Sequence, residues 1–494
     1  MVKAKVNEKV LEKTVGRCRE KGIIIPTFAQ QKDPSKIPAK IKGALKNIGL
    51  WDVNPLNLFR ITWKNNPKEN GGDGLYGGVN YIEMPPALTG VKAKIIGLVG
   101  KWMPTGCHKV GAGFGCLVPR LVTGEFDPTT QKAVWPSTGN YCRGGAFDCA
   151  LLACDAVAIL PEEMSKERFD WLKEIGTKEI FATPGCESNV KEIYDKCWEL
   201  RKERGNKIVI FNQFDEFGNC IWHYEMTGSA IEEVFGQLKA KNAKLRLSSY
   251  VSATGSAGTL GAGEYLKKKF PTIKNAATEA LQCPTLYLNG FGGHRIEGIG
   301  DKHVPWIHNV RNTDNVVAID DEDTMRLLRL FNEPAGKKLL EREGLKKDFI
   351  EKLSFLGISS ICNLLASIKM AKYYEMNEND VIFTTFTDPA DMYKSRLKEM
   401  EAARGKYTEE YALVDLKKSL HGAGLDWIKE LSYWDRKALH NLKYFTWVEQ
   451  QGKTVEEINA LWHPEFWDEM FSQIPAWDKL IEEFNNKTGL LKKL

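Results

Sequence analysis

The sequence predicts an α/β protein with mostly parallel sheets and a helical C-terminal extension. Short apolar runs alternate with amphipathic stretches of ten to fifteen residues, such as 166–175 and 189–202. This alternation is typical of βαβ units, in which a helix connects two parallel strands. The apolar runs expected to form strands are 93–99, 133–135, 156–160, 179–181, 207–211, 245–251, 315–319 and 381–385.

Composition narrows the class of protein. The 494 residues are 43% hydrophobic and 27% charged, which is ordinary for a globular protein and allows about three domains. A net charge of +5 is too small to indicate a nucleic-acid partner. No apolar run reaches the ~18 residues of a membrane span. The eleven cysteines are scattered without a C-x-x-C pair, so we expect reduced thiols, no metal site and a cytoplasmic protein.

Two extensions flank the α/β region. Residues 1–78 are rich in lysine and in Pro, Asn and Gly clusters, and we expect an irregular extension with short helices. Residues 396–494 are helical by propensity and hold six of the fourteen tryptophans. So many aromatic side chains are not expected to face water, so this segment should pack on the core, on a second subunit or over the mouth of the site.

Lys109 is the first candidate catalytic residue. It follows the turn Pro104-Thr105-Gly106 and precedes a predicted helix at 110–117. A lysine that forms a Schiff base must be held in a pocket and must lose its proton readily. The positive end of a helix disfavours an ammonium and lowers its pKa. The alternative is an ordinary lysine at a helix start.

A loop of small residues offers an anion-binding site. It follows the strand at 245–251, precedes a helix that begins near residue 260, and comprises Thr254, Gly255, Ser256, Ala257, Gly258 and Thr259. Consecutive backbone N–H groups at a helix N-terminus bind phosphate well. The alternative is a tight turn without a ligand. A dinucleotide site is excluded because neither 111–115 nor 258–263 has the G-x-G-x-x-G spacing.

Two further segments supply candidate ligand-binding groups. Ser137, Thr138, Gly139 and Asn140 lie between the strand at 133–135 and a predicted helix at 146–157, where they suit a carboxylate, and Asn140 could reach a phenolic oxygen. Ser359 precedes an apolar helix at 361–373 and suits a pyridine nitrogen, which a serine leaves unprotonated. A neutral ring is a weaker electron sink and favours β-elimination. In both segments the alternative is a plain helix N-cap. An amine, a carboxylate loop, a phosphate nest and a ring-nitrogen partner are what pyridoxal phosphate requires.

The motifs resemble the fold-type II pyridoxal-phosphate enzymes over residues 79 to 395, in particular the cysteine synthase and cystathionine β-synthase branch of the tryptophan synthase β superfamily. Residues 104–109 resemble the lysine motif, 137–140 the substrate loop T-S-G-N, and 255–259 the loop G-T-G-G-T. The stretches 160–176, 212–214, 223–228, 294–300 and 357–360 match further family segments in the same order.

The resemblance implies the fold and the residue roles. It implies two three-layer α/β/α domains with twisted, mostly parallel sheets, and a homodimer. The smaller domain, 79–220, would carry the lysine and the substrate loop, and the larger, 221–395, the phosphate loop. Lys109 would be the Schiff-base lysine and the base for the Cα proton. Asn140 would bind the ring oxygen O3′, residues 254–259 the phosphate and Ser359 the ring nitrogen. Ser137, Thr138, Gly139, Asn140 and Gln213 would bind the substrate carboxylate.

The implied reaction is β-elimination or β-replacement through an aminoacrylate intermediate, on an amino acid with a leaving group at Cβ. Two alternatives stay open: a threonine or serine dehydratase-like ammonia-lyase, and a non-catalytic cofactor-binding subunit that acts through its C-terminal tail. The chain departs from the family where Tyr141-Cys142-Arg143 follows Asn140, which suggests a larger or acidic substrate. It departs again at Ala257, where glycine is usual.

Overall fold

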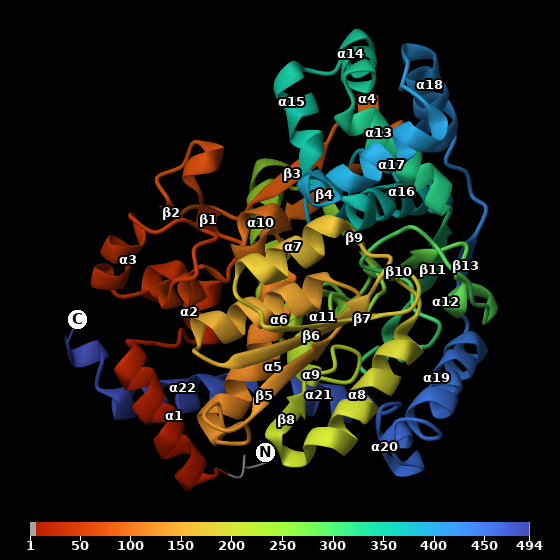
Figure 1. Cartoon of the computed structure of the whole chain (residues 1–494). Coiled ribbons are helices and arrows are strands. Elements are labelled where there is room, and N and C mark those ends of the chain that lie inside the picture. The colour runs from red at the N-terminus through yellow and green to blue at the C-terminus, as the bar shows by residue number, and fades with distance from the viewer. Residues whose placement is uncertain (1–5, 494) are drawn as a thin grey trace.

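Two separate sheets organise the chain in the computed structural model, which describes residues 6–493 (Figure 1). The larger sheet has seven strands in the order β13-β11-β10-β9-β12-β4-β3. Its inner strands are parallel, and only the edge strands β3 and β13 pair antiparallel. Its strands are β3 (Tyr81–Met84), β4 (Lys94–Val99), β9 (Arg246–Ala253), β10 (Lys274–Ala280), β11 (Asn315–Ile319), β12 (Asp380–Phe386) and β13 (Ile428–Glu430).

The smaller sheet has four strands in the order β7-β6-β5-β8, all parallel. Its strands are β5 (Lys132–Pro136), β6 (Asp155–Pro161), β7 (Glu179–Thr183) and β8 (Ile208–Ile210). A short antiparallel pair, β1 (Asn65–Asn66) with β2 (Leu75–Tyr76), lies apart in the N-terminal extension. The α/β class with mostly parallel sheets is confirmed, while the domain limits stay a prediction. The chain first forms β3 and β4 in the larger sheet and returns to that sheet at β9.

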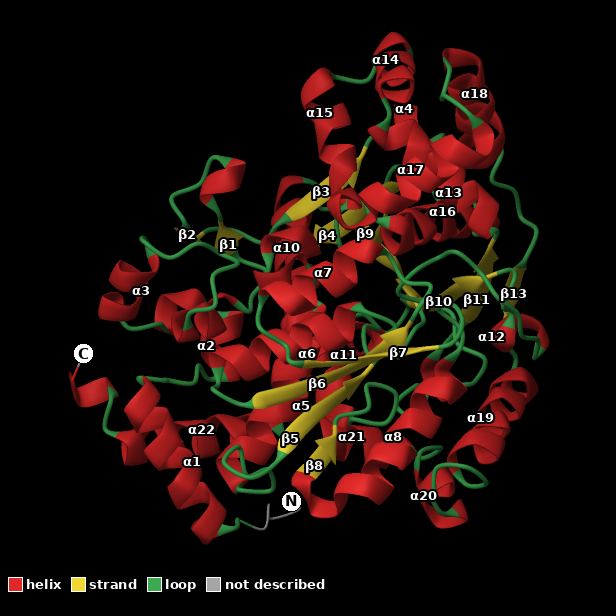
Figure 2. Cartoon of the chain, in the orientation of Figure 1, coloured by secondary structure: helices red, strands yellow, loops and turns green. Residues whose placement is uncertain are grey.

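Helices surround both sheets (Figure 2). Those before β9 are α1 (Glu8–Lys21), α2 (Phe28–Lys32), α3 (Ala39–Leu45), α4 (Pro86–Thr89), α5 (Lys109–Thr123), α6 (Asn140–Leu151), α7 (Lys166–Glu174), α8 (Val190–Arg204), α9 (Phe217–Trp222) and α10 (Gly228–Lys241). Those between β9 and β12 are α11 (Leu260–Lys269), α12 (Thr285–Leu288), α13 (Asp321–Asn332), α14 (Pro334–Arg342), α15 (Lys347–Lys352) and α16 (Ile358–Tyr373). The C-terminal region adds α17 (Lys394–Arg404), α18 (Glu409–Val414), α19 (Tyr433–Trp447), α20 (Val455–Ala460), α21 (Pro464–Phe471) and α22 (Ile474–Thr488).

The helix predicted at 146–157 is displaced in the structure. α6 begins at Asn140 and ends at Leu151, and β6 already starts at Asp155. Gly144 and Gly145 lower helix propensity, which is why the sequence indicated a later start. They are tolerated because α6 packs closely on its neighbours: a methyl group on Gly144 would lie 2.7 Å from the Lys109 carbonyl oxygen. The glycines therefore bring α6 against the start of α5.

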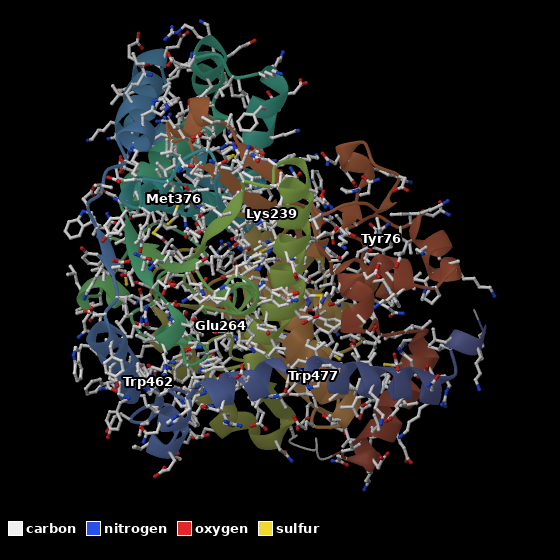
Figure 3. All side chains as sticks on the ribbon, turned by 180° about the vertical axis from the view of Figure 1, so that it is seen from behind. Tyr76, Lys239, Glu264, Met376, Trp462 and Trp477 are labelled. Carbon is white, nitrogen blue, oxygen red and sulfur yellow. The ribbon has the colours of Figure 1, made fainter. Side chains whose placement is uncertain are left out.

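The two ends of the chain pack together on α5. We call α1, α2 and α22 the terminal belt; Figure 1 shows α1 and α22 side by side, and Figure 3 shows Trp477 on α22 as this helix crosses the base of the molecule. The Asn485 side chain pairs with the backbone of Ile25, at 2.7 and 3.1 Å. The Phe28 ring lies 5.4 Å from the Phe114 ring of α5 and 5.6 Å from the Trp477 ring. Sequence-distant segments therefore share one apolar cluster with the helix that begins at Lys109.

The tryptophan-rich extension also packs on the α/β core, one of the three placements expected from the sequence. Trp447 is fully buried and donates its indole N–H to the Val304 carbonyl at 2.9 Å. Trp467 is buried too, whereas Trp434 is 77% exposed. Among residues 6–493 no single helix is long and apolar enough to cross a membrane, although one bent pair, Lys347–Phe355 with Ile358–Tyr373, has the length and composition.

Candidate functional site

Lys109 is the first residue of α5, and its side chain is almost fully buried. A tight turn precedes it, in which Thr105 and Gly106 have positive φ angles of 69° and 67°. Lys109 Nζ donates to Ser256 Oγ at 2.9 Å and lies 3.4 Å from Gln213 Oε1. Burial lowers the pKa of Lys109 below its usual value. The lowered pKa has the direction expected from the sequence, and burial is its largest cause.

The loop of residues 254–259 connects β9 to α11, as predicted. Ala257 has a φ of 63°, in the left-handed region where a side chain costs about 1–2 kcal/mol. Within residues 6–493, the backbone N–H groups of Ser256, Ala257 and Thr259 donate to no protein acceptor. Free N–H groups in front of a helix N-terminus form an anion-binding concavity. The loop therefore has the chemistry of a phosphate site.

Asn219 supports this loop from α9. Its Nδ2 donates to Ser256 Oγ at 2.9 Å and to the Gln213 carbonyl at 3.0 Å. Gly258 faces the same amide so closely that any side chain there would overlap it. Sequence reasoning missed Asn219, because nothing in its local pattern distinguishes it from an ordinary helical asparagine.

The segment Ser137–Gly139 forms the turn between β5 and α6. Ser137 Oγ accepts hydrogen bonds from the Gly139 N–H and from Gln213 Nε2, both at 3.1 Å. Gly139 has a φ of 137°, which favours glycine, and a side chain there would overlap the Arg168 guanidinium. Arg168 in turn donates to the Thr138 carbonyl at 2.6 Å. Because Gln213 contacts both Ser137 and Lys109, the substrate loop and the lysine lie in one site.

Asn140, at the start of α6, and Ser359, in the first turn of α16, lie close together. Asn140 Nδ2 donates to Asp388 Oδ2 at 2.7 Å, and its Oδ1 accepts from Arg143 at 3.3 Å. Ser359 lies in the first turn of α16, is 1% exposed, and has no partner for its hydroxyl within residues 6–493. A methyl group on Gly298 would lie 3.7 Å from Ser359 Oγ and 3.9 Å from Asn140 Nδ2. Both side chains therefore border the same narrow space.

The N-cap interpretation is wrong for Ser359, whereas the segment 137–140 does contain a turn and the N-cap of α6. The N-cap of α6 is Gly139 and that of α16 is Gly357, and neither cap makes a side-chain hydrogen bond. Ser359 lies inside its helix, so its hydroxyl does not serve the helix end. The hydroxyl is therefore available to another group.

The suggestion of a larger or acidic substrate loses its basis in the structure. Arg143 is fully buried, donates to the Thr105 carbonyl at 2.9 Å and stacks 4.5 Å from the Trp171 ring. The Tyr141 ring packs 5.3 Å from Trp135 in the core. The Tyr141 ring is thus packed in the core, and the Arg143 guanidinium is engaged by Thr105, Asn140 and Trp171, so neither side chain is free to select an unusual substrate.

Several titratable groups lie buried near the lysine. The rings of His108 and His223 are 4.7 Å apart, and burial lowers the pKa of both. Asp301 is also buried, and this burial raises its pKa to about 8. Such shifts indicate a poorly solvated environment in which neutral forms are favoured.

Comparisons with known proteins agree with this geometry. The family model described as pyridoxal-phosphate dependent enzyme matches residues 103–337. A cysteine synthase from Staphylococcus aureus is 30% identical over 263 residues, 53% of this chain and 75% of the relative. A cystathionine beta-synthase from Saccharomyces cerevisiae is 25% identical over 328 residues, 65% of this chain and 60% of the relative. The crystal structure of O-acetyl serine sulfhydrylase isoform 3 from Entamoeba histolytica covers 69% of this chain and 93% of its own, with 25% identity and a TM-score of 0.55.

Proposed function

Since this chain belongs to the pyridoxal-phosphate-dependent enzymes of the cysteine synthase and cystathionine β-synthase type, we propose that it catalyses β-elimination or β-replacement on an amino acid with a leaving group at Cβ. One observation carries the proposal: the buried Lys109 amine contacts both Gln213, which holds the substrate loop, and Ser256, in the phosphate loop. A single amine can thus serve both the cofactor and the substrate.

The residues present fit the cofactor. The N–H groups of Ser256, Ala257 and Thr259, which donate to no acceptor among residues 6–493, suit its phosphate, and the Lys109 amine suits its aldehyde. The partnerless Ser359 hydroxyl suits the ring nitrogen, and Asn140 Nδ2 has a second hydrogen for the ring oxygen. When bound, pyridoxal phosphate supplies an electron-withdrawing ring that stabilises negative charge at the substrate Cα.

The protein's own groups bind the substrate and move its proton. Ser137, Thr138, Gly139 and Gln213, with the N-terminus of α6, bind the carboxylate beside Asn140. Lys109 takes the proton from Cα at its Nζ, and burial, which lowers the pKa of Lys109, favours the neutral amine that accepts this proton. Departure of the group at Cβ then leaves a product that either accepts a nucleophile or is hydrolysed.

Ser359 bears on the type of reaction. A neutral hydroxyl opposite the ring nitrogen does not hold a proton there, whereas a carboxylate would. With Ser359 as its partner, the bound cofactor would withdraw electrons less strongly, which would favour loss of a β-substituent over reactions that need a long-lived carbanion.

The test is an amino-acid panel with purified protein. Serine, cysteine and O-acetylserine are each added with and without a thiol or sulfide, and visible absorption, keto acid, ammonia and sulfide are measured. We expect a coloured protein whose absorption shifts with at least one of the three. Keto acid and ammonia from serine, with no sulfide from cysteine and no reaction of O-acetylserine with sulfide or a thiol, would instead support the dehydratase alternative.

Lys109 is tested separately by borohydride reduction and peptide mapping. We expect the reduced cofactor on the peptide that contains Lys109. Lys109→Ala should lower turnover on the order of 10³-fold or more, because it removes both the covalent attachment and the proton carrier. Lys239→Ala, at an exposed position of α10 (Figure 3), is the matched control and should change neither result. A label on another lysine would refute the proposal.

The assembly and location belong to the same proposal. We propose a homodimer in the cytoplasm, which the family resemblance and the thiols support: ten of the eleven free cysteines are buried. Size-exclusion chromatography with light scattering tests the dimer, and a mass of about one chain would contradict it.

A further inference from the structure

We propose that Asp388 is a positioning residue that fixes the Asn140 amide for the cofactor and couples it, through Tyr393 and Arg168, to the substrate loop. The inference rests on the proposed function, because it assigns Asn140 to the cofactor ring. Asp388 lies just beyond β12 in the larger sheet, whereas Asn140 follows β5 in the smaller one. The 2.7 Å hydrogen bond between them therefore spans the two halves of the site.

The two neighbours of Asn140 permit one orientation of its amide. Arg143 has only donors, so it must face Oδ1, which it does at 3.3 Å. The Asp388 oxygen accepts, so it must face Nδ2. An amide rotated by 180° would place donor against donor and acceptor against acceptor. With one Nδ2 hydrogen bound to Asp388, the other is held in a fixed direction beside Gly298 and Ser359.

The hydrogen bonds close a ring through the substrate loop. Tyr393 Oη donates to Asp388 Oδ2 at 2.7 Å and accepts from Arg168 Nη2 at 3.0 Å. Arg168 Nη1 donates to the Thr138 carbonyl at 2.6 Å, two residues before Asn140. A shift of the substrate loop therefore moves Thr138 and Asn140 together against a fixed Arg168-Tyr393-Asp388 frame.

The frame is buried and charged. Arg168, Asp388 and Tyr393 are all fully buried, and Glu297 and Glu187 lie 3.4 and 3.7 Å from the same guanidinium. Burial raises the pKa of Asp388, while Arg168 opposes that rise. Oδ2 accepts both hydrogen bonds and Oδ1 has no partner within residues 6–493, so a proton on Oδ1 leaves the ring intact. Weakly solvated hydrogen bonds of this kind are costly to break.

The backbone of Asp388 holds the other side of the same space. Its carbonyl accepts the Gly357 N–H at 2.7 Å and the Ser360 hydroxyl at 3.4 Å. These contacts fix the first turn of α16, which carries Ser359. One residue thus positions Asn140 with its side chain and Ser359 with its main chain. The substitution Asp388→Ala removes the side-chain contact with Asn140 but keeps the backbone carbonyl that holds α16.

The experiment compares Asp388→Ala with Asp388→Asn as holoenzymes without substrate. The visible absorption spectrum and its pH titration report the hydrogen bond at the ring oxygen, and equilibrium titration reports cofactor affinity. We expect Asp388→Ala to shift the absorption maximum and to bind the cofactor about tenfold more weakly. Asp388→Asn keeps an acceptor oxygen, so its spectrum should match the wild type and its affinity should stay within about threefold.

Tyr393→Phe tests the coupling, because it opens the ring but leaves Asp388 beside Asn140. We expect the KM for the amino acid to rise about three- to tenfold, with kcat within twofold and an unchanged resting spectrum. An Asp388→Ala spectrum identical to the wild type would overturn the positioning role, and an unchanged KM in Tyr393→Phe would overturn the coupling. A wild-type protein without a lysine-bound cofactor would instead refute the proposed function, so the two failures are distinguishable.

Discussion

The candidate site and the terminal belt are built by different rules. In the site, Ala257 and Thr105 hold positive φ angles, and the Ser359 hydroxyl is buried without a partner among residues 6–493. In the belt, α1 has a capping Asn7 and α2 a complete capping box at Thr27. The Asp478 carboxylate also accepts the backbone N–H groups at the start of α2. The belt satisfies backbone groups at the starts of α1 and α2, although Gln31 Nε2 of α2 is buried without a partner within residues 6–493. The site leaves several of its polar groups available.

The contrast suggests that the belt mainly stabilises the fold, while the site provides groups for binding and catalysis. Strain and unpaired polar atoms cost free energy and persist where the surrounding structure holds them in place. The belt contributes to that surrounding structure, because it packs on α5, the helix that begins with Lys109. Substitutions in the belt should therefore lower the free energy of unfolding with little effect on turnover. Substitutions in the site should change substrate binding or turnover, with smaller effects on the free energy of unfolding.

The largest effect on stability is expected for Phe28→Ala in the belt. Phe28 is fully buried between Phe114 and Trp477, so removing its ring should lower the free energy of unfolding by about 3–5 kcal/mol. Urea unfolding followed by circular dichroism measures this. The exposed Phe445→Ala is the control and should change it by less than about 0.5 kcal/mol. A changed cofactor spectrum in folded Phe28→Ala would show that the belt belongs to the site.

Gly139→Ala should affect both quantities. Its φ of 137° and its closeness to Arg168 leave no room for a side chain, so we expect a loss of about 1–3 kcal/mol and a KM raised about tenfold or more. Gly236→Ala is the matched control: this helical glycine has open space around it and should gain about 0.5–1 kcal/mol. Thermal unfolding and steady-state kinetics on the same preparations decide the case. Wild-type KM in Gly139→Ala would remove the turn from the substrate site.

The sequence predicted most strands of this fold but not β1, β2, β3, β10 and β13, and the last two are instructive. Strands buried on both faces are continuous apolar runs, so the run at 93–99 became β4 within one residue. β10 was missed because Lys274–Ala280 is rich in Ala, Asn and Glu, which are poor strand formers, although it is central in the sheet. β13 was missed because its three residues form a strand only through pairing with β11.

The residues of the site likewise fall into those that the local sequence indicated and those that it did not. Lys109, the loop 254–259 and the turn before Asn140 have local signatures, since small residues in front of helices produce their geometry. Asp388 has none: 248 residues separate it from Asn140, and only the fold brings them together. Arg168 was visible in a family motif, but its contact with the Thr138 carbonyl was not. Local sequence therefore indicates which groups bind, and tertiary structure determines which groups hold them.

Ala257→Gly tests whether the strain in the phosphate loop is real. Glycine adopts the φ of 63° without penalty, which should raise the free energy of unfolding by about 1–2 kcal/mol. Its greater freedom in the unfolded chain lowers the free energy of unfolding by roughly 0.5–1 kcal/mol. We expect a net gain of about 0.5–1 kcal/mol in the free energy of unfolding. The control Ala240→Gly, at an exposed position of α10, should lose about 1 kcal/mol instead. A loss in both variants would mean that the loop is not strained at Ala257.

The smallest effect is expected where the belt meets the loop that follows α5. Lys13 of α1 lies 2.9 Å from Asp127. Burial opposes ionisation here, but hydrogen bonds from Thr129 and Lys13 lower the pKa of Asp127 to about 2. Because the folded pKa is below the unfolded value of ~3.9, the stabilisation is complete above pH 4 and is lost as the pH falls through about 2.

Lys13 is 44% exposed, so Lys13→Met should cost only about 0.5 kcal/mol at pH 7. That difference from the wild type should shrink between pH 4 and pH 3 in urea unfolding. A difference that persists unchanged at low pH would come from packing of the lysine stem, and the pair would then be part of the apolar belt rather than an electrostatic link.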